Sequence, residues 1–299
     1  MEDLSVHIVV ICLLLAALSL VWFLRSKPGF KKSPSSSSCP NPNCIRCQRY
    51  RLVQKSAQKR LPWLVKDVKR EFPHESSLAR VSSSVRTGST LKGISRQQAP
   101  TVLLVQGLTA RPVVTNLHTS TCVRFLQDEN LRNGILLDLE NYNQQWLDND
   151  THGWQVLQLL NQGVWNQENL ETCPKLARLL KSLPDLLDKC LFGNAFCSKI
   201  MPGTIITPHC GPTNVRHRLQ YAITMPPTSN QQAGLKVGDD QVLTWQQGKA
   251  FVFDDSFEHS VDYSTNSRGE RIVLIVDLWH PELTLAERRL LERLYPPVP

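Results

Sequence analysis

The sequence predicts a mainly β protein with supporting helices, built as a jelly-roll-like double sheet behind an N-terminal transmembrane helix. After Gly193, short apolar stretches follow one another with turn residues between them, and one uninterrupted apolar run lies near the N-terminus. Helices followed by many short antiparallel strands favour two packed sheets. The 299 residues, 41% of them hydrophobic, are enough to bury a sizeable core.

The N-terminal apolar run covers residues 6–24 and follows a tail at residues 1–5. A helix that spans a bilayer needs about 20 mostly apolar residues, so the run predicts a single uncleaved signal-anchor helix. The alternative is a cleaved signal peptide. Glu2 and Asp3 argue against it because they make the leading segment acidic, and the run is longer than the apolar core of most signal peptides.

Positive charge is concentrated beside this predicted span. Residues 25–100 carry 17 Lys and Arg against three acidic residues, a net charge of +14, whereas residues 101–299 carry a net charge of −4. The overall charge of +8 is therefore no indication of nucleic-acid binding, and we expect no nucleic-acid partner. The positive charge after the span favours a cytosolic body.

Residues 25–99 are predicted to be a linker, because Ser, Pro and Gly are frequent and little can be buried. Within it, Ala57–Phe72 predicts a short basic amphipathic helix near the membrane, entered at Pro62, with solvated or lipid-facing Lys and Arg. Three cysteines match half of a zinc site, with palmitoylation or a disulfide as alternatives. They are Cys39, Cys44 and Cys47.

The remaining residues, 100–299, are predicted to form the globular domain. A strand is expected at 101–108 and a helix within 171–190, where five leucines share one face. These leucines are Leu176, Leu179, Leu180, Leu183 and Leu187. Strands are then expected within 195–206, 216–225, 241–245, 249–255, 258–263 and 271–279, before a final helix at 283–295.

Two histidines stand out as metal-ligand candidates, since His209 and His259 each adjoin a predicted strand. Two imidazoles on neighbouring strands of a barrel can face one divalent metal ion. Arg271 opens the next predicted strand, and an arginine inside a barrel is costly unless it meets an anion. Either histidine alone is more commonly structural, but together with Arg271 the pair indicates a metal centre beside a carboxylate clamp.

A third protein ligand is not evident from the spacing. An iron oxygenase often carries His-x-Asp, but Gly211 stands at the carboxylate position here, and Cys210 is expected to point to the opposite face of its strand. Other carboxylates nearby are expected to cap turns. These are Asp254, Asp255 and Glu258.

Three segments, 202–220, 249–261 and 271–284, resemble the aspartyl/asparaginyl β-hydroxylase family. The likeness is closest to its single-pass membrane subfamily, the aspartate beta-hydroxylase domain-containing proteins, and it extends from Trp154 to the C-terminus. It implies a double-stranded β-helix with iron(II) and 2-oxoglutarate as cofactors and O2 as co-substrate. It also implies glycine where other oxygenases carry the carboxylate, so Gly211 matches.

The resemblance assigns roles to individual residues. It implies that His209 and His259 ligate iron, and that Arg271 pairs with the distal carboxylate of 2-oxoglutarate with help from Ser198. Arg218 would lie near the carboxylate that chelates the metal. The other implied cofactor-binding residues are Trp154, His217, Leu219 and Gln220. Family members commonly carry His where this chain has Gln220, and this departure puts cofactor affinity or activity in question.

The leading hypothesis is a membrane-anchored dioxygenase that hydroxylates Asp or Asn in a protein or peptide, such as an epidermal-growth-factor-like module. A catalytically inactive scaffold is the alternative, and a lipid-binding interaction protein is a third reading. The resemblance favours a body in the lumen of the endoplasmic reticulum, against the charge bias around the span. A lumenal body could use the glycosylation sequon at 149–151.

Overall fold

A computed structural model describes residues 50–74, 78–88, 97–115, 128–142, 146–148, 153–226, 234–239, 241–263 and 269–297. The predicted span, the three linker cysteines and the sequon lie outside the described residues. Among the residues that are described, no helix combines the length and the apolar character needed to cross a membrane.

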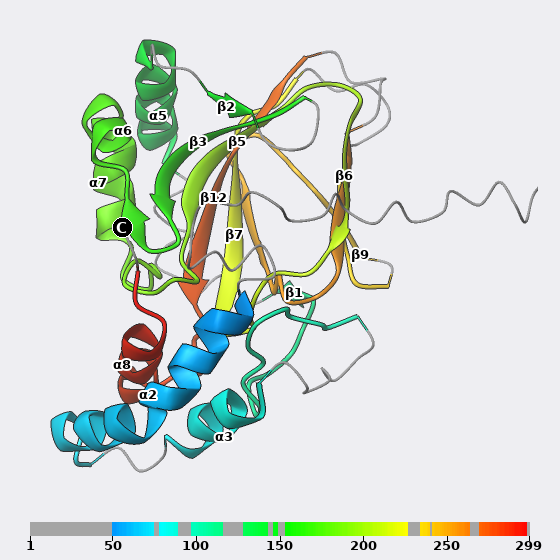
Figure 1. The fold of residues 1–299 in the computed structure, drawn as a ribbon. Helices are drawn as coiled ribbons and strands as arrows, with labels where there is room; N and C mark the ends of the chain where they lie inside the picture. Colours follow the sequence, from blue (N-terminus) through cyan, green and yellow to red (C-terminus); the bar gives the residue numbers. More distant parts are fainter. Residues whose placement is uncertain are drawn as a thin grey trace, which may run out of the picture. The chain divides into compact units, whose positions relative to one another are not determined.

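Two antiparallel sheets form the body (Figure 1). The large sheet has the order β1-β10-β7-β12-β5-β3-β2, with β4 paired to β3, and the small sheet has the order β6-β11-β8-β9. The large sheet comprises β1 (Val113–Val114), β2 (Leu147–Asp148), β3 (Trp154–Asn161), β4 (Val164–Trp165), β5 (Ala195–Ile200), β7 (Arg216–Thr224), β10 (Ala250–Phe253) and β12 (Arg271–Trp279). The small sheet comprises β6 (Thr204–His209), β8 (Gly234–Val237), β9 (Gln241–Thr244) and β11 (His259–Tyr263).

The chain crosses between the two sheets repeatedly from β5 to β12. Strands β5, β7, β10 and β12 belong to the large sheet, and β6, β8, β9 and β11 belong to the small one. Eight strands distributed in this way over two antiparallel sheets form a jelly roll. The mainly β double sheet with supporting helices is therefore confirmed.

Alternation along each strand gives the large sheet two buried faces. On β12, Val273 and Ile275 belong to the apolar cluster between the sheets, whereas Leu274 and Val276 belong to a second cluster on the outer face. Three helices cover that outer face: α5 (Glu129–Asn141), α6 (Gln167–Thr172) and α7 (Pro174–Ser182) (Figure 1). The inner face of the large sheet consequently faces the small sheet and lines the space between them.

The helix predicted within 171–190 is present but shorter and divided. It consists of the end of α6 followed by the whole of α7. Helix α7 stops at Ser182, and Leu183 is extended because Pro184 disfavours helical backbone in the residue before it. All five predicted leucines are buried, Leu183 and Leu187 among them although they follow the helix.

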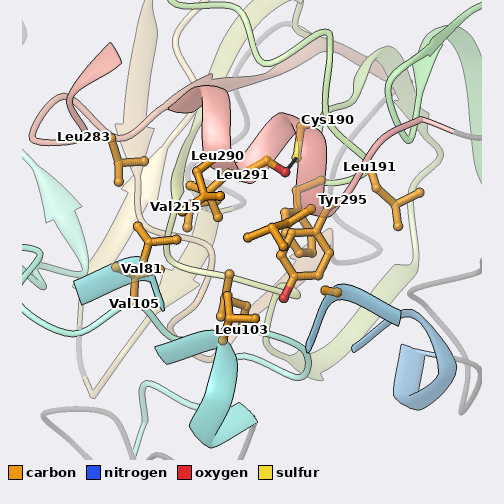
Figure 2. Close-up of a cluster of buried hydrophobic side chains, with 14 of the residues drawn as sticks. Val81, Leu103, Val105, Cys190, Leu191, Val215, Leu283, Leu290, Leu291 and Tyr295 are labelled. Atoms are coloured by element: carbon orange, nitrogen blue, oxygen red, sulfur yellow. Dashed lines mark hydrogen bonds between the residues drawn. The ribbon is translucent and has the colours of Figure 1, made fainter. Parts of the chain in front are cut away.

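A third apolar cluster joins α2 (Tyr50–Glu71), α3 (Ala79–Thr87) and α8 (Leu285–Leu294), and Figure 2 shows part of it. Ala57 and Leu61 of α2 are fully or almost fully buried there. The linker prediction for 25–99 is therefore wrong for α2 and α3, which belong to the core. Helix α2 also begins seven residues before the predicted start, with Pro62 in its interior.

The segment 101–108 is buried, as its apolar residues suggest, but it is not the predicted strand. Only Leu103 forms an isolated bridge, to Thr213. The side chain of Asn214 replaces further strand pairing, since its Oδ1 accepts from the N–H of Val105 at 2.7 Å and its Nδ2 donates to the Val105 carbonyl at 2.9 Å.

Candidate metal and cofactor site

The two candidate histidines are direct cross-strand partners in the small sheet. His209 ends the edge strand β6 and pairs with His259, the first residue of β11, so that their ring centroids lie 4.2 Å apart. His209 is exposed, whereas His259 is buried. The predicted juxtaposition of the two imidazoles is therefore present in the structure.

Both rings are oriented in the same way by the backbone. Nδ1 of His209 lies 2.8 Å from the Thr207 carbonyl, and Nδ1 of His259 lies 2.9 Å from the Phe257 carbonyl. Because a carbonyl oxygen only accepts, each Nδ1 carries the proton and each Nε2 keeps its lone pair. Burial, together with the nearby His209, lowers the pKa of His259 to about 3, so this ring is neutral at pH 7 and able to bind a metal ion.

In the part of the chain that the structure describes, no third protein ligand completes this pair. Within the described ranges, no three His, Cys, Asp or Glu residues are grouped so that they could hold a metal ion. A Cβ atom on Gly211 would lie 2.4 Å from Oδ2 of Asp255, so even the first atom of a ligand side chain does not fit. The thiol of Cys210 contacts the carbonyl of Gln97 at 3.7 Å instead.

Asp255 belongs to a buried network of two carboxylates and two guanidinium groups. Arg216 donates to Asp255 Oδ2 at 2.5 Å and to Asp277 Oδ2 at 2.8 Å, and Arg218 donates to Asp277 Oδ1 at 2.8 Å. Burial alone would raise the pKa of Asp255, but attraction to both arginines outweighs it and holds that pKa below its ordinary value. The turn role predicted for Asp255 is therefore wrong.

The other two carboxylates behave differently from Asp255. Oδ1 of Asp254 accepts from the N–H of Ser256 at 2.9 Å, which confirms its turn role, and burial raises its pKa to about 7. The side chain of Glu258 is exposed, and its backbone N–H donates to the Gln97 carbonyl. Neither supplies the missing ligand.

Arg271 lies between the sheets, and it forms no ion pair with the residues that the structure describes. It is 2% exposed, and its Nε and Nη1 are buried without a hydrogen-bond partner in the part of the chain that the structure describes. Burial lowers the pKa of its guanidinium to about 9. Its guanidinium lies over the ring of Trp245, whose centroid lies 4.0 Å from Cζ. Buried donors of this kind fit an anionic ligand group.

Two further predicted residues adjoin Arg271 across the large sheet. Trp154 of β3 and Arg271 of β12 are both register partners of Ile200 on the intervening β5. The indole N–H of Trp154 donates to Oγ of Ser198 at 3.1 Å, which leaves the serine hydroxyl hydrogen available for a ligand. The structure therefore brings Trp154, Ser198 and Arg271 to one part of the inner surface.

Strand alternation separates the four predicted positions on β7. Arg218 and Gln220 share the inner face, whereas Leu219 belongs to the outer cluster beneath the helices. His217 lies on that outer side too, with its ring 4.4 Å from His280. The structure thus does not bring His217 and Leu219 together with the other candidate residues.

One residue of the site was missed by the sequence analysis. Trp245 follows β9 and is buried, and its indole N–H donates to Oε1 of Gln220 at 2.8 Å while its ring stacks on Arg271. A single tryptophan after a short strand carries no pattern that predicts this contact.

The fold and site together define a jelly-roll protein with two adjacent histidines and a buried arginine whose Nε and Nη1 lack a hydrogen-bond partner among the described residues. The sequence model for aspartyl/asparaginyl beta-hydroxylase matches residues 129–281. Human aspartate beta-hydroxylase domain-containing protein 2 is 31% identical over 280 residues, which cover 87% of this chain and 70% of that protein. The chain therefore belongs to the aspartyl/asparaginyl β-hydroxylase family.

Other relatives match over shorter stretches. Human aspartyl/asparaginyl beta-hydroxylase is 38% identical over 46% of this chain and 17% of its own length. Among solved structures, HygX from Streptomyces hygroscopicus with nickel and 2-oxoglutarate has a TM-score of 0.37 at 8% identity, covering 53% of this chain and 82% of its own. A Pseudomonas putida prolyl-4-hydroxylase has a TM-score of 0.35 at 14% identity, covering 56% and 97%.

Proposed function

We propose that this chain is an iron(II)- and 2-oxoglutarate-dependent dioxygenase that hydroxylates Asp or Asn side chains of a protein substrate. The observation that carries the proposal is Arg271 on the inner surface of the jelly roll, whose buried Nε and Nη1 have no hydrogen-bond partner among the described residues. Family membership and the paired histidines support the same reading.

The residues present fit these cofactors chemically. Nε2 of His209 and Nε2 of His259 would hold the iron, and the guanidinium of Arg271 would hold the distal carboxylate of 2-oxoglutarate. When bound, iron(II) and 2-oxoglutarate supply the oxygen activation that hydroxylation of a C–H bond requires. Two protein ligands in place of three leave one more coordination position for small molecules.

The protein would contribute binding, orientation and exclusion of water. Ser198 would donate its hydroxyl hydrogen to the carboxylate at Arg271, because its oxygen already accepts from Trp154. Arg218 would lie toward the metal-bound carboxylate, with its own charge balanced by Asp255 and Asp277. The apolar cluster between the sheets would keep the pocket dry, which strengthens each of these polar contacts.

Membrane anchoring through residues 6–24, with a body in the lumen of the endoplasmic reticulum, is part of the proposal. The exposed face of α2 supports a location near a membrane surface, because Trp63 is 75% exposed and basic side chains lie on the same stripe. These side chains are Lys55, Lys59, Lys66 and Arg70. A protein substrate of the epidermal-growth-factor-like kind follows from the resemblance alone.

An inactive scaffold is the second candidate function, and Gln220 is the observation that favours it. The position commonly carries His in the family, and here the glutamine amide is hydrogen-bonded to Trp245. A neutral amide holds a carboxylate less strongly than a charged imidazole does. Catalytic turnover, rather than cofactor binding, separates the two candidates.

The purified chain tests the proposal by its metal content and by succinate formation from 2-oxoglutarate. We expect His259→Ala to lose stoichiometric iron and succinate formation. The control, His74→Ala, removes an exposed histidine near the end of α2 and should retain both. Iron binding without succinate, even with Asp-containing peptides, would favour the scaffold. Equal metal content in wild type and His259→Ala would refute the metal assignment.

A further inference from the structure

We propose that the exposed face of α2 is a docking surface for anionic phospholipid headgroups, and that it holds the folded body against the membrane. The inference rests on the membrane-anchoring part of the proposed function and is independent of the dioxygenase assignment. The partner would be a negatively charged bilayer surface, which many headgroups form together, rather than a single lipid molecule.

The opposite face of α2 fixes which side chains point outward. Ala57, Leu61 and Val68 belong to the apolar cluster that α2 shares with α3 and α8, and they are at most 1% exposed. Glu71, the last residue of the helix, forms an ion pair with Arg289 of α8 at 3.0 Å. The side chains on the other side of α2 therefore point away from the core.

Basic and apolar side chains share that outward face. Trp63 has the highest exposed fraction of the large apolar side chains that the structure describes, and Leu52 is exposed too. Positions three or four residues apart lie on one stripe of a helix. The exposed stripe consists of Leu52, Lys55, Lys59, Trp63, Lys66 and Arg70. Lysines around an exposed tryptophan are typical of helices that lie in the interface of a bilayer.

The protein balances little of the positive charge on this stripe. Asp67 and Glu71 are the acidic residues of α2. Asp67 pairs with Arg70 at 3.2 Å, and Glu71 pairs with α8. The three lysines of the stripe form no ion pair with a residue that the structure describes. Their charge is thus free to attract anionic headgroups, while the indole suits the boundary between headgroups and acyl chains.

The position of α2 in the sequence favours a bilayer over an acidic protein or a nucleic acid as the partner. Only residues 25–49 separate α2 from the apolar run at 6–24. A chain segment of this length reaches at most about 90 Å when fully extended, so a span at 6–24 would keep the stripe within that distance of the bilayer. Such a tether raises the effective concentration of the surface, so individually weak contacts suffice.

Fluorescence quenching of the full chain in lipid vesicles tests the surface. Vesicles of phosphatidylcholine are compared with vesicles that also contain phosphatidylserine, both with acyl chains brominated near the headgroup. The difference between wild type and Trp63→Phe isolates the signal of Trp63. We expect quenching of Trp63 in the anionic vesicles and not in the neutral ones, and we expect added salt to reduce it.

Paired charge reversals separate this surface from a general effect of net charge. Lys59→Glu with Lys66→Glu should abolish the quenching of Trp63, because these lysines lie one turn before and one turn after the indole. The matched control, Arg178→Glu with Lys181→Glu, makes the same change of charge on exposed side chains of α7 and should retain the quenching. Circular dichroism checks that both double variants keep the wild-type fold.

Unquenched Trp63 in both kinds of vesicle, equal quenching in both, or equal loss in the two double variants would overturn the proposed surface. The difference between wild type and Trp22→Phe reports on the predicted span in the same vesicles. An unquenched Trp22 would overturn the anchor, while quenching of Trp63 in anionic vesicles alone would still support the surface. Iron content and succinate formation test the dioxygenase assignment separately.

Discussion

Two buried arginines of this protein differ in what faces them. Arg216 is bonded to the carboxylates of Asp255 and Asp277. Arg271 instead contacts a tryptophan ring, and its Nε and Nη1 have no hydrogen-bond partner among the residues described. A buried charge without a partner lowers the free energy of unfolding. When a paired buried charge is removed, the partner charges stay buried without compensation, and this also lowers the free energy of unfolding. Replacement of the two side chains is therefore expected to change the free energy of unfolding in different ways.

This difference gives a prediction for methionine substitutions. Arg271→Met should leave the free energy of unfolding unchanged or higher, because removal of the buried charge offsets the loss of its contact with the Trp245 ring. It should weaken 2-oxoglutarate binding about 100-fold or more. Arg216→Met should lower the free energy of unfolding by about 3–5 kcal/mol. Urea unfolding and calorimetry measure both. A strong loss of stability in Arg271→Met would assign that arginine a structural role.

At the residue scale, the sequence predicted the site residues whose side-chain type is distinctive and whose neighbouring sequence marks a strand. His209, His259 and Arg271 were recognisable because imidazole and guanidinium are uncommon inside a barrel. Asp255 was misjudged as a turn residue, since its ion pairs come from Arg216 and Arg218 on another strand. Trp245 was missed because its two contacts depend on the packing of one sheet on the other.

At the scale of elements, α2 shows how composition can conceal a core helix. The helix is rich in Lys and Arg, yet Ala57, Leu61 and Val68 lie on one stripe and are at most 1% exposed. That stripe belongs to the apolar cluster that α2 shares with α3 and α8. Glu71 adds ion pairs to Arg289 and Arg293 of α8. The helix is part of the folded body for this reason.

Two leucines of α2 test this placement. Leu61→Ala should lower the free energy of unfolding by about 2–5 kcal/mol, because it removes a side chain that is 1% exposed. Leu52→Ala is the matched control on the same helix, and it should change stability by less than about 0.5 kcal/mol because Leu52 is 61% exposed. Similar values for both variants would show that α2 does not pack on the body.

The strands were predicted better than the helices and loops. The expected ranges contain β5, β7 and β9 to β12, because apolar alternation and Gly or Pro turns mark each of them. The range 195–206 contains only the start of β6, and no range predicted β8. The segment 101–108 was wrong because a buried apolar run also suits an irregular segment when a side chain, here Asn214, satisfies its backbone. Local pattern does not report such long-range hydrogen bonds.

At the scale of the whole molecule, buried ionisable groups make stability depend on pH. Burial, with His280 nearby, lowers the pKa of His217 from 6.5 to about 3. Below pH 6.5 the unfolded chain takes up a proton that the folded chain refuses, so this group reduces stability as pH falls toward 3. Asp254 has the opposite sign, because its raised pKa of about 7 costs stability as pH rises from 3.8 to 7.

We therefore expect the free energy of unfolding to fall more steeply between pH 6 and pH 4.5 in wild type than in His217→Gln. The difference in slope should approach about 1.4 kcal/mol per pH unit, the value for one proton. Urea unfolding at several pH values measures it, and the slopes, not the absolute stabilities, are compared. Parallel curves would show that His217 titrates normally in the folded state.

The cross-strand histidine pair has a consequence for the edge of the small sheet. Among the described strands, β6 has one hydrogen-bonded neighbour, β11, and His209 is its last residue. An edge strand exposes unpaired backbone groups and is a place where sheets fray or join other chains. A divalent cation shared by His209 and His259 would bridge β6 and β11 at the terminal residue pair of β6. The concentration of that cation would then set how often this end of the edge strand separates from β11, and how readily the strand pairs with another copy of the protein.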